Sequence, residues 1–174
     1  MTNWPGHAVL QVGVPELESW IVARTRHYDP GFISSDPRFR HAHITVLAPL
    51  TDWDSDAIAR IAANTPSFSF QLSRVDVFPD GCLYLPPTPD QQFRELTRQA
   101  WAAHPHVKPN GAPSPAPHLT VDRLAPEVTM ASTRALLGRN IPVTCRAEAL
   151  ELVWYEADNC HLIERYELGL TATR

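Results

Sequence analysis

Two short segments of the sequence carry the same pattern of side chains that can transfer protons. His43 is followed by Ile44, Thr45 and Val46, and the same order of residue types recurs as His-Leu-Thr-Val at 118–121. Successive side chains of a β-strand point to opposite faces, so the imidazole and the hydroxyl of each segment share one face. If the folded chain brings these two faces together, the resulting site holds two imidazoles and two hydroxyls.

This set of groups suits proton transfer at a phosphorus centre. One neutral histidine of the pair His43 and His118 can take a proton from an attacking hydroxyl or water, while the other, protonated, donates to the leaving alkoxide. The hydroxyls of Thr45 and Thr120 can donate hydrogen bonds to the non-bridging phosphate oxygens. Such a site uses no metal and no cofactor. We expect a bell-shaped dependence of the rate on pH, and the sequence leaves open which histidine is the acid.

The paired motifs resemble those of the two-histidine (2H) phosphoesterases, which include the 2′-5′ RNA ligase family and the cyclic nucleotide phosphodiesterases. That superfamily carries two H-x-[ST]-x motifs in the two lobes of a pseudo-symmetric fold around a central cleft. The order and separation of the motifs and the proline-rich linker between them also agree. The resemblance implies that His43 and His118 are the catalytic pair and that Thr45 and Thr120 hold the phosphate.

The resemblance also implies a class of reaction and of substrate. We expect a metal-independent phosphodiesterase that hydrolyses, or reversibly ligates, a 2′,3′-cyclic phosphate or a 2′-5′ linkage on a nucleotide or an RNA end. Some members of the superfamily carry an arginine five residues after the second histidine, and Arg123 stands at that position. Strict alternation would place Arg123 on the face opposite His118, so it can bind the phosphate only if the strand ends or bulges before it.

The elements that must position these residues alternate along the chain. Apolar or alternating segments predict strands at 8–14, 41–47, 67–78, 82–85, 117–124, 141–155 and 161–171. Helical periodicity beside proline or capping residues predicts helices at 15–28, 55–64, 90–104 and 127–137.

Each half of the chain therefore repeats a histidine-bearing strand, a short helix and an antiparallel pair of strands. This order predicts an α+β fold in which two pseudo-symmetric lobes with antiparallel sheets flank a central cleft and the helices lie on the outer faces. We expect a single bilobal domain over residues 1–174, with lobe one at roughly 8–104 and lobe two at roughly 117–171. An exchange of strands between the lobes stays open.

Composition narrows the range of partners. The net charge is −4 and Lys108 is the one lysine, which argues against binding duplex nucleic acid through many phosphate contacts. No apolar run approaches the roughly 20 residues of a membrane helix, and the N-terminus has no signal-peptide pattern. We expect a cytoplasmic monomer with no membrane contact. Cys82, Cys145 and Cys160 form no C-x-x-C pair and are expected to be reduced, partly buried thiols.

Two other functions fit the same residues. A cleft with two histidines could bind a nucleotide or an RNA end without turning it over. A metal-dependent hydrolase could instead use His41, His43 and His118 as ligands, although no acidic or cysteine ligand is patterned beside them. His41 on its own is expected to be exposed, and His104 and His106 are expected to be solvated in the proline-rich loop.

Aromatic residues near the ends of the predicted strands form a further group of candidates. Phe78, Tyr84 and Tyr155 could stack on a nucleobase. The five tryptophans are expected in the core or at its rim.

Overall fold

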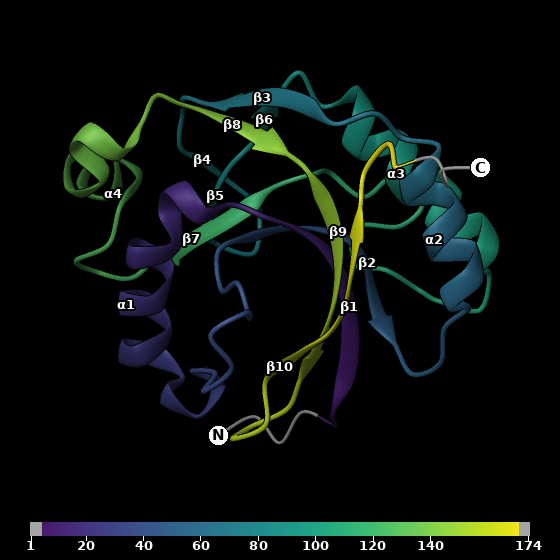
Figure 1. Cartoon of the computed structure of the whole chain (residues 1–174). Helices are drawn as coiled ribbons and strands as arrows, with labels where there is room; N and C mark the ends of the chain where they lie inside the picture. The colour runs from purple at the N-terminus through teal and green to yellow at the C-terminus, as the bar shows by residue number, and fades with distance from the viewer. Residues whose placement is uncertain (1–4, 171–174) are drawn as a thin grey trace.

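The computed structural model describes residues 5–170, and within them the chain forms antiparallel sheets and four α-helices (Figure 1). The helices are α1 (Glu18–Tyr28), α2 (Ser55–Ala63), α3 (Gln91–Ala103) and α4 (Met130–Leu137). The strands are β1 (His7–Gly13), β2 (His43–Leu50), β3 (Phe68–Leu72), β4 (Asp76–Val77), β5 (Cys82–Leu85), β6 (Pro87–Thr88), β7 (Leu119–Arg123), β8 (Val143–Ala147), β9 (Ala149–Tyr155) and β10 (His161–Glu167). The predicted α+β class with antiparallel sheets is confirmed.

The largest sheet has four strands in the order β10-β9-β1-β2, so the two C-terminal strands pair with the N-terminal one. Helices α2 and α3 lie on one side of this sheet and α1 lies on the other (Figure 1). Helix α3 buries Phe93, Leu96 and Ala100, which recur at the helical spacing that predicted it. The hydroxyl of Thr97 donates to the carbonyl of Val46 at 2.8 Å, which fixes α3 against β2.

Two smaller sheets have the orders β6-β3-β8 and β4-β5-β7. The predicted strands at 67–78 and 141–155 are each divided, because the chain leaves one sheet for another partway along them. In the first, the buried positions run 68, 70, 72 and then 75, so alternation breaks between β3 and β4. In the second, β8 pairs with β3 while β9 lies between β10 and β1.

Side-chain caps and tight turns set the ends of several elements. The Asp54 side chain accepts from the backbone N–H of Ala57 at 2.9 Å and starts α2 at the predicted position. Helix α4 begins later than predicted, after Thr129, whose side chain and that of Ser132 form a capping box. The turn between β4 and β5 contains Gly81, whose φ of 89° favours glycine.

His104 is buried at the end of α3, contrary to the solvated position expected from the proline-rich loop. Its Nδ1 donates to the carbonyl of Ala100 at 2.8 Å, and its Nε2 accepts from the N–H of Asp54 at 3.0 Å. This neutral ring therefore links the end of α3 to the start of α2. His106 is exposed and pairs with Asp52.

No helix within residues 5–170 is both long enough and apolar enough to cross a bilayer. The three cysteines are free thiols: Cys145 and Cys160 are buried and Cys82 is partly exposed.

Candidate active site

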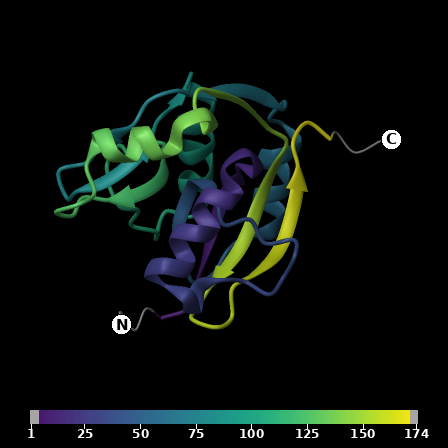
Figure 2. The ribbon, with the colours of Figure 1, turned by 90° about the vertical axis from the view of Figure 1, so that its left-hand side faces the viewer.

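A cleft of about 800 Å³ lies between the four-stranded sheet, β7 and helix α1. Seen from the side of α1 and α4, helix α1 runs in front of the long strands (Figure 2). The five residues predicted from the sequence all line this cleft: His43, Thr45, His118, Thr120 and Arg123. The structure therefore brings together two segments that lie 75 residues apart in the chain.

The two histidine rings are held in the same way. Nδ1 of His43 lies 2.8 Å from the carbonyl oxygen of His41, and Nδ1 of His118 lies 2.7 Å from that of Ala116. A carbonyl oxygen can only accept, so each Nδ1 carries the proton and donates it. In the neutral form, each Nε2 then holds a lone pair and can accept a proton. Both rings are thus fixed in the tautomer that general acid–base chemistry at Nε2 requires.

A β-bulge decides where Arg123 points. On β5, Leu83 pairs with Asp122 and the next residue, Tyr84, pairs with Thr120, so Val121 is an extra residue on β7. An extra residue reverses the alternation of the side chains that follow it. The condition under which Arg123 could reach the cleft is therefore met: Thr120 and Arg123 both line it.

Strand β2 has a register shift at the position that corresponds to the bulge in β7. Its register with β1 shifts by one residue after Thr45, and Ala48, five residues after His43, faces the cleft. The two strands thus present the same sequence of inward positions, with one difference. The position that holds Arg123 on β7 is held by Ala48 on β2.

The surroundings of His43 favour its neutral form. Burial lowers the pKa of the His43 imidazole below its ordinary value, and the charges of His118 and His41 act in the same direction. The hydrogen bond to the His41 carbonyl and the carboxylate of Glu18 oppose this shift without cancelling it. The electrostatic influence of His118 on His43 agrees with two rings that face one cleft. Near neutral pH His43 is therefore suited to accept a proton.

Glu18 of α1 positions His43 indirectly. Its Oε2 accepts from the N–H of Ala42 at 2.8 Å, and its Oε1 accepts from the N–H and Nδ1 of His41 at 3.0 and 2.8 Å. The carbonyl of His41 and the N–H of Ala42 belong to one peptide group. Glu18 therefore fixes the peptide whose carbonyl orients the His43 ring.

The sequence predicted that His41 is exposed, and this prediction is wrong. Both ring nitrogens of His41 form hydrogen bonds inside the protein. Its Nδ1 donates to Glu18, and its Nε2 accepts from the N–H of Ser34 at 3.1 Å. Its side chain is 10% exposed. With both ring nitrogens occupied, His41 has no free lone pair for a metal. Within residues 5–170, no group of three or more His, Cys, Asp or Glu side chains is placed to hold a metal ion.

Aromatic rings pack against both histidines. Phe78 and Tyr84 stack on each other at 3.8 Å between ring centroids, and both meet His118 edge to face at 4.9 and 5.6 Å. The Tyr155 ring lies 5.9 Å from that of His43. Phe78 and Tyr84 therefore support His118, and of these three proposed stacking residues only Tyr155 lines the cleft.

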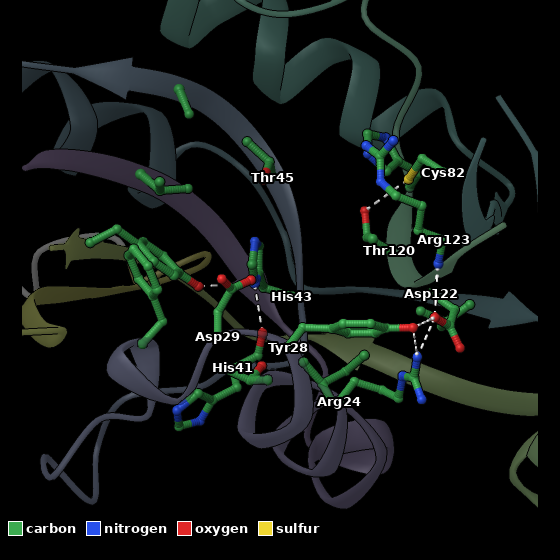
Figure 3. Close-up of a pocket in the computed structure, with 18 of the residues that line it drawn as sticks. Arg24, Tyr28, Asp29, His41, His43, Thr45, Cys82, Thr120, Asp122 and Arg123 are labelled. Carbon is green, nitrogen blue, oxygen red and sulfur yellow. Dashed lines mark hydrogen bonds and ion pairs between the residues drawn. The ribbon is translucent and has the colours of Figure 1, made fainter. Parts of the chain in front are cut away.

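A polar cluster that the sequence did not indicate joins α1 to β7. The carboxylate of Asp122, which is buried, pairs with the guanidinium of Arg24 and accepts from the hydroxyl of Tyr28 at 3.0 Å. Trp20 donates from its indole N–H to the carbonyl of Val121 at 3.2 Å. Figure 3 shows Arg24, Tyr28 and Asp122 together on one side of the cleft. The helical pattern of 15–28 predicted α1 but gave no sign of its partner strand.

Arg123 stands at the rim of the cleft. Its side chain is 65% exposed, and its Nη1 donates to the carbonyl of Asp80 at 3.0 Å. On the neighbouring strand, Sγ of Cys82 lies 3.6 Å from the hydroxyl oxygen of Thr120. The guanidinium can therefore meet an anion entering the cleft beside Thr120.

The chain is similar to known proteins in its sequence pattern and in its fold. A family model described as the 2′-5′ RNA ligase superfamily matches residues 13–159. A crystal structure of TT0787 from Thermus thermophilus is 19% identical, with a TM-score of 0.63, over 94% of this chain and 98% of that chain. A crystal structure of E. coli LigT with 3′-AMP is 14% identical, with a TM-score of 0.59, over 95% and 99% of the two chains. No curated protein sequence matches the chain.

Proposed function

Because the chain belongs to the 2′-5′ RNA ligase superfamily, we propose that it is a metal-independent phosphodiesterase acting on 2′,3′-cyclic phosphates or 2′-5′ linkages of nucleotides or RNA ends. One observation carries the proposal: His43 and His118 face one cleft and each donates from Nδ1 to a backbone carbonyl. This arrangement leaves both Nε2 atoms for proton transfer.

The proposed hydrolysis uses the two rings in different protonation states. Neutral His43 takes a proton at Nε2 from a water that attacks the phosphorus. Protonated His118 gives its Nε2 proton to the ribose oxygen that leaves, so one P–O bond forms and one breaks. The hydroxyls of Thr45 and Thr120 and the guanidinium of Arg123 donate to the non-bridging oxygens as their charge grows. Ligation by the same site would use the 5′-hydroxyl of a second RNA end in place of water, so that the cyclic phosphate opens to a 2′-5′ linkage. The reverse of that step releases the 5′-hydroxyl and restores the cyclic phosphate, with the roles of the two histidines exchanged.

The class of substrate is supported by the ligands of a structural relative. E. coli LigT has been crystallised with 3′-AMP, with ATP, with NADP+ and with phosphate. A cleft of about 800 Å³ lies within the size range of small-molecule sites.

Hydrolysis of a 2′,3′-cyclic mononucleotide in the presence of EDTA tests the proposal. We expect turnover by the wild-type protein and a loss of about 10²- to 10⁴-fold in kcat for His43→Ala and for His118→Ala, because each variant removes one proton-transfer group. His106→Ala, which changes an exposed histidine outside the cleft, is the matched control and should retain full activity.

The outcomes separate the three functions. Activity that EDTA abolishes would favour the metal-dependent hydrolase. A wild-type protein that binds nucleotides but turns over neither cyclic phosphates nor 2′-5′-linked dinucleotides would favour the non-catalytic binding protein.

A further inference from the structure

Tyr28 lines the cleft, and the proposed chemistry gives it no role. It is 49% exposed, whereas the other large exposed apolar residues among those described are three leucines outside the cleft. Aromatic side chains stabilise a protein chiefly by burying their surface, and ligand clefts are lined largely by such side chains, so a half-exposed ring in this cleft has surface left to bury against a ligand. The last residue of α1 thus offers aromatic surface to whatever enters the cleft.

The ring is held in place from three directions. Its hydroxyl donates to Asp122 at 3.0 Å, the guanidinium carbon of Arg24 lies 4.4 Å from the ring centroid, and His27 meets it edge to face at 4.9 Å. These contacts fix the plane of the ring. A ligand that packs on it therefore meets a surface that is already ordered and loses little further entropy in ordering it.

The arrangement leaves one face of the ring toward the phosphate-binding hydroxyls. Figure 3 shows the Tyr28 ring nearly on edge, with Arg24 on one side of its plane and Thr45 and Thr120 on the other. Arg24 covers one face by a cation–π contact. A ring that already faces a cation is a poor site for a second one, so the open face best suits a neutral, planar ligand group.

We propose that the open face of Tyr28 is a nucleobase-stacking subsite, which binds the base of the nucleotide whose phosphate lies between His43 and His118. The location of that phosphate rests on the proposed function, whereas the stacking surface rests on Tyr28 and its contacts. A base that stacks on a tyrosine face is bound without regard to its hydrogen-bonding edge. The subsite therefore selects nucleotides over other phosphate esters and discriminates weakly among bases.

Calorimetric titration with adenosine 2′-phosphate and, separately, with inorganic phosphate tests this subsite. In Tyr28→Leu, we expect the Kd for the nucleotide to rise about 5- to 150-fold, the range that corresponds to the loss of one stacked base. The ratio of the affinities for nucleotide and inorganic phosphate should fall by a similar factor. Tyr28→Phe keeps the ring and should stay within about threefold of the wild type.

Leu136→Ala, which changes a residue that is 72% exposed outside the cleft, serves as the control for loss of exposed apolar surface. The proposal is overturned if Tyr28→Leu binds the nucleotide as tightly as the wild type does, or if it weakens nucleotide and inorganic phosphate equally. It is also overturned if the wild type does not bind the nucleotide. Hydrolysis of adenosine 2′,3′-cyclic phosphate and of a 2′-5′-linked dinucleotide by the same proteins separates the two proposals. If neither substrate is turned over but the expected binding pattern is found, the proposed function is refuted and the subsite stands.

Discussion

The substitution Glu18→Gln tests how α1 controls the histidine on β2. The carboxylate of Glu18 receives three hydrogen bonds, two on Oε1 from His41 and one on Oε2 from the N–H of Ala42. Glutamine keeps one carbonyl oxygen but replaces the other by an NH₂ group, which can only donate. At least one of the three donors then loses its acceptor.

The loss of stability follows from that one donor. Leaving a largely buried N–H without its charged acceptor costs about 1–3 kcal/mol, which we expect as the decrease in the free energy of unfolding at pH 7. Burial raises the pKa of the Glu18 carboxyl, but the hydrogen bonds from His41 and Ala42 outweigh it and lower the pKa below 4.5. A lowered pKa stabilises the folded state above the unfolded value, and this stabilisation disappears as pH falls through the folded value. The difference in the free energy of unfolding between the wild type and Glu18→Gln should therefore become smaller below pH 4.5.

The effect on catalysis has two parts. We expect kcat to fall about 10- to 100-fold, because the peptide that orients the His43 ring is no longer fixed. The negative charge of Glu18 raises the pKa of His43, so its removal lowers that pKa further. If neutral His43 is the base, the acidic limb of the kcat/KM profile must then move to lower pH.

Urea unfolding at several pH values and a pH–rate profile with a cyclic mononucleotide provide the two measurements. Glu95→Gln is the matched control, because Glu95 is an exposed carboxylate on α3 that pairs with Arg98, and its loss should leave the free energy of unfolding nearly unchanged. An acidic limb that stays in place or moves to higher pH would refute the role of His43 as the base. An unchanged kcat would refute the positioning role of Glu18.

Two further predictions concern residues at the edges of the site and beyond it. His104→Ala removes the buried ring that links Ala100 to Asp54. Urea unfolding should therefore show a decrease of about 2–4 kcal/mol in the free energy of unfolding, while kcat/KM of the folded protein stays unchanged. A change in kcat/KM would place His104 in the catalytic machinery. Arg123→Ala should lower kcat/KM about 10- to 100-fold and change the free energy of unfolding by no more than about 0.5 kcal/mol. The reason is that the guanidinium is exposed and its proposed hydrogen bonds go to the phosphate of the substrate. A loss of stability with an unchanged kcat/KM would contradict this role.

The residues that carry local patterns could be read from the sequence. Each H-x-T segment shows in four consecutive residues its strand and the side chains that line the cleft, and α3 shows its buried face in its own periodicity. The register of a strand cannot be read from local patterns, because a bulge arises from pairing with another strand. Nothing between His118 and Arg123 indicates that Val121 is the extra residue. The sequence therefore showed that Arg123 needs a bulge to reach the cleft, but it did not show that the bulge is present.

The polar partners of the site depend on residues far away in the chain. His41 binds Glu18 at a separation of 23 residues, and Tyr28 meets Asp122 at a separation of 94. A single histidine in a strand carries no mark of the carboxylate that a distant helix brings to it. For the same reason the sequence placed His41 at the surface, and it missed the role of α1 in building one wall of the cleft.

If Arg123 binds the phosphate as proposed, the difference between Ala48 and Arg123 gives the two-histidine site a direction. Two equivalent histidines and two equivalent threonines would accept a phosphodiester in either of two orientations, related by a half-turn, with equal affinity. A single guanidinium on the β7 side makes these orientations unequal, and a charge-assisted hydrogen bond worth about 1.5–3 kcal/mol would populate one of them about 10- to 150-fold over the other. One side-chain difference between two similar strands can thus decide which ester oxygen departs and, with it, the isomer of the product.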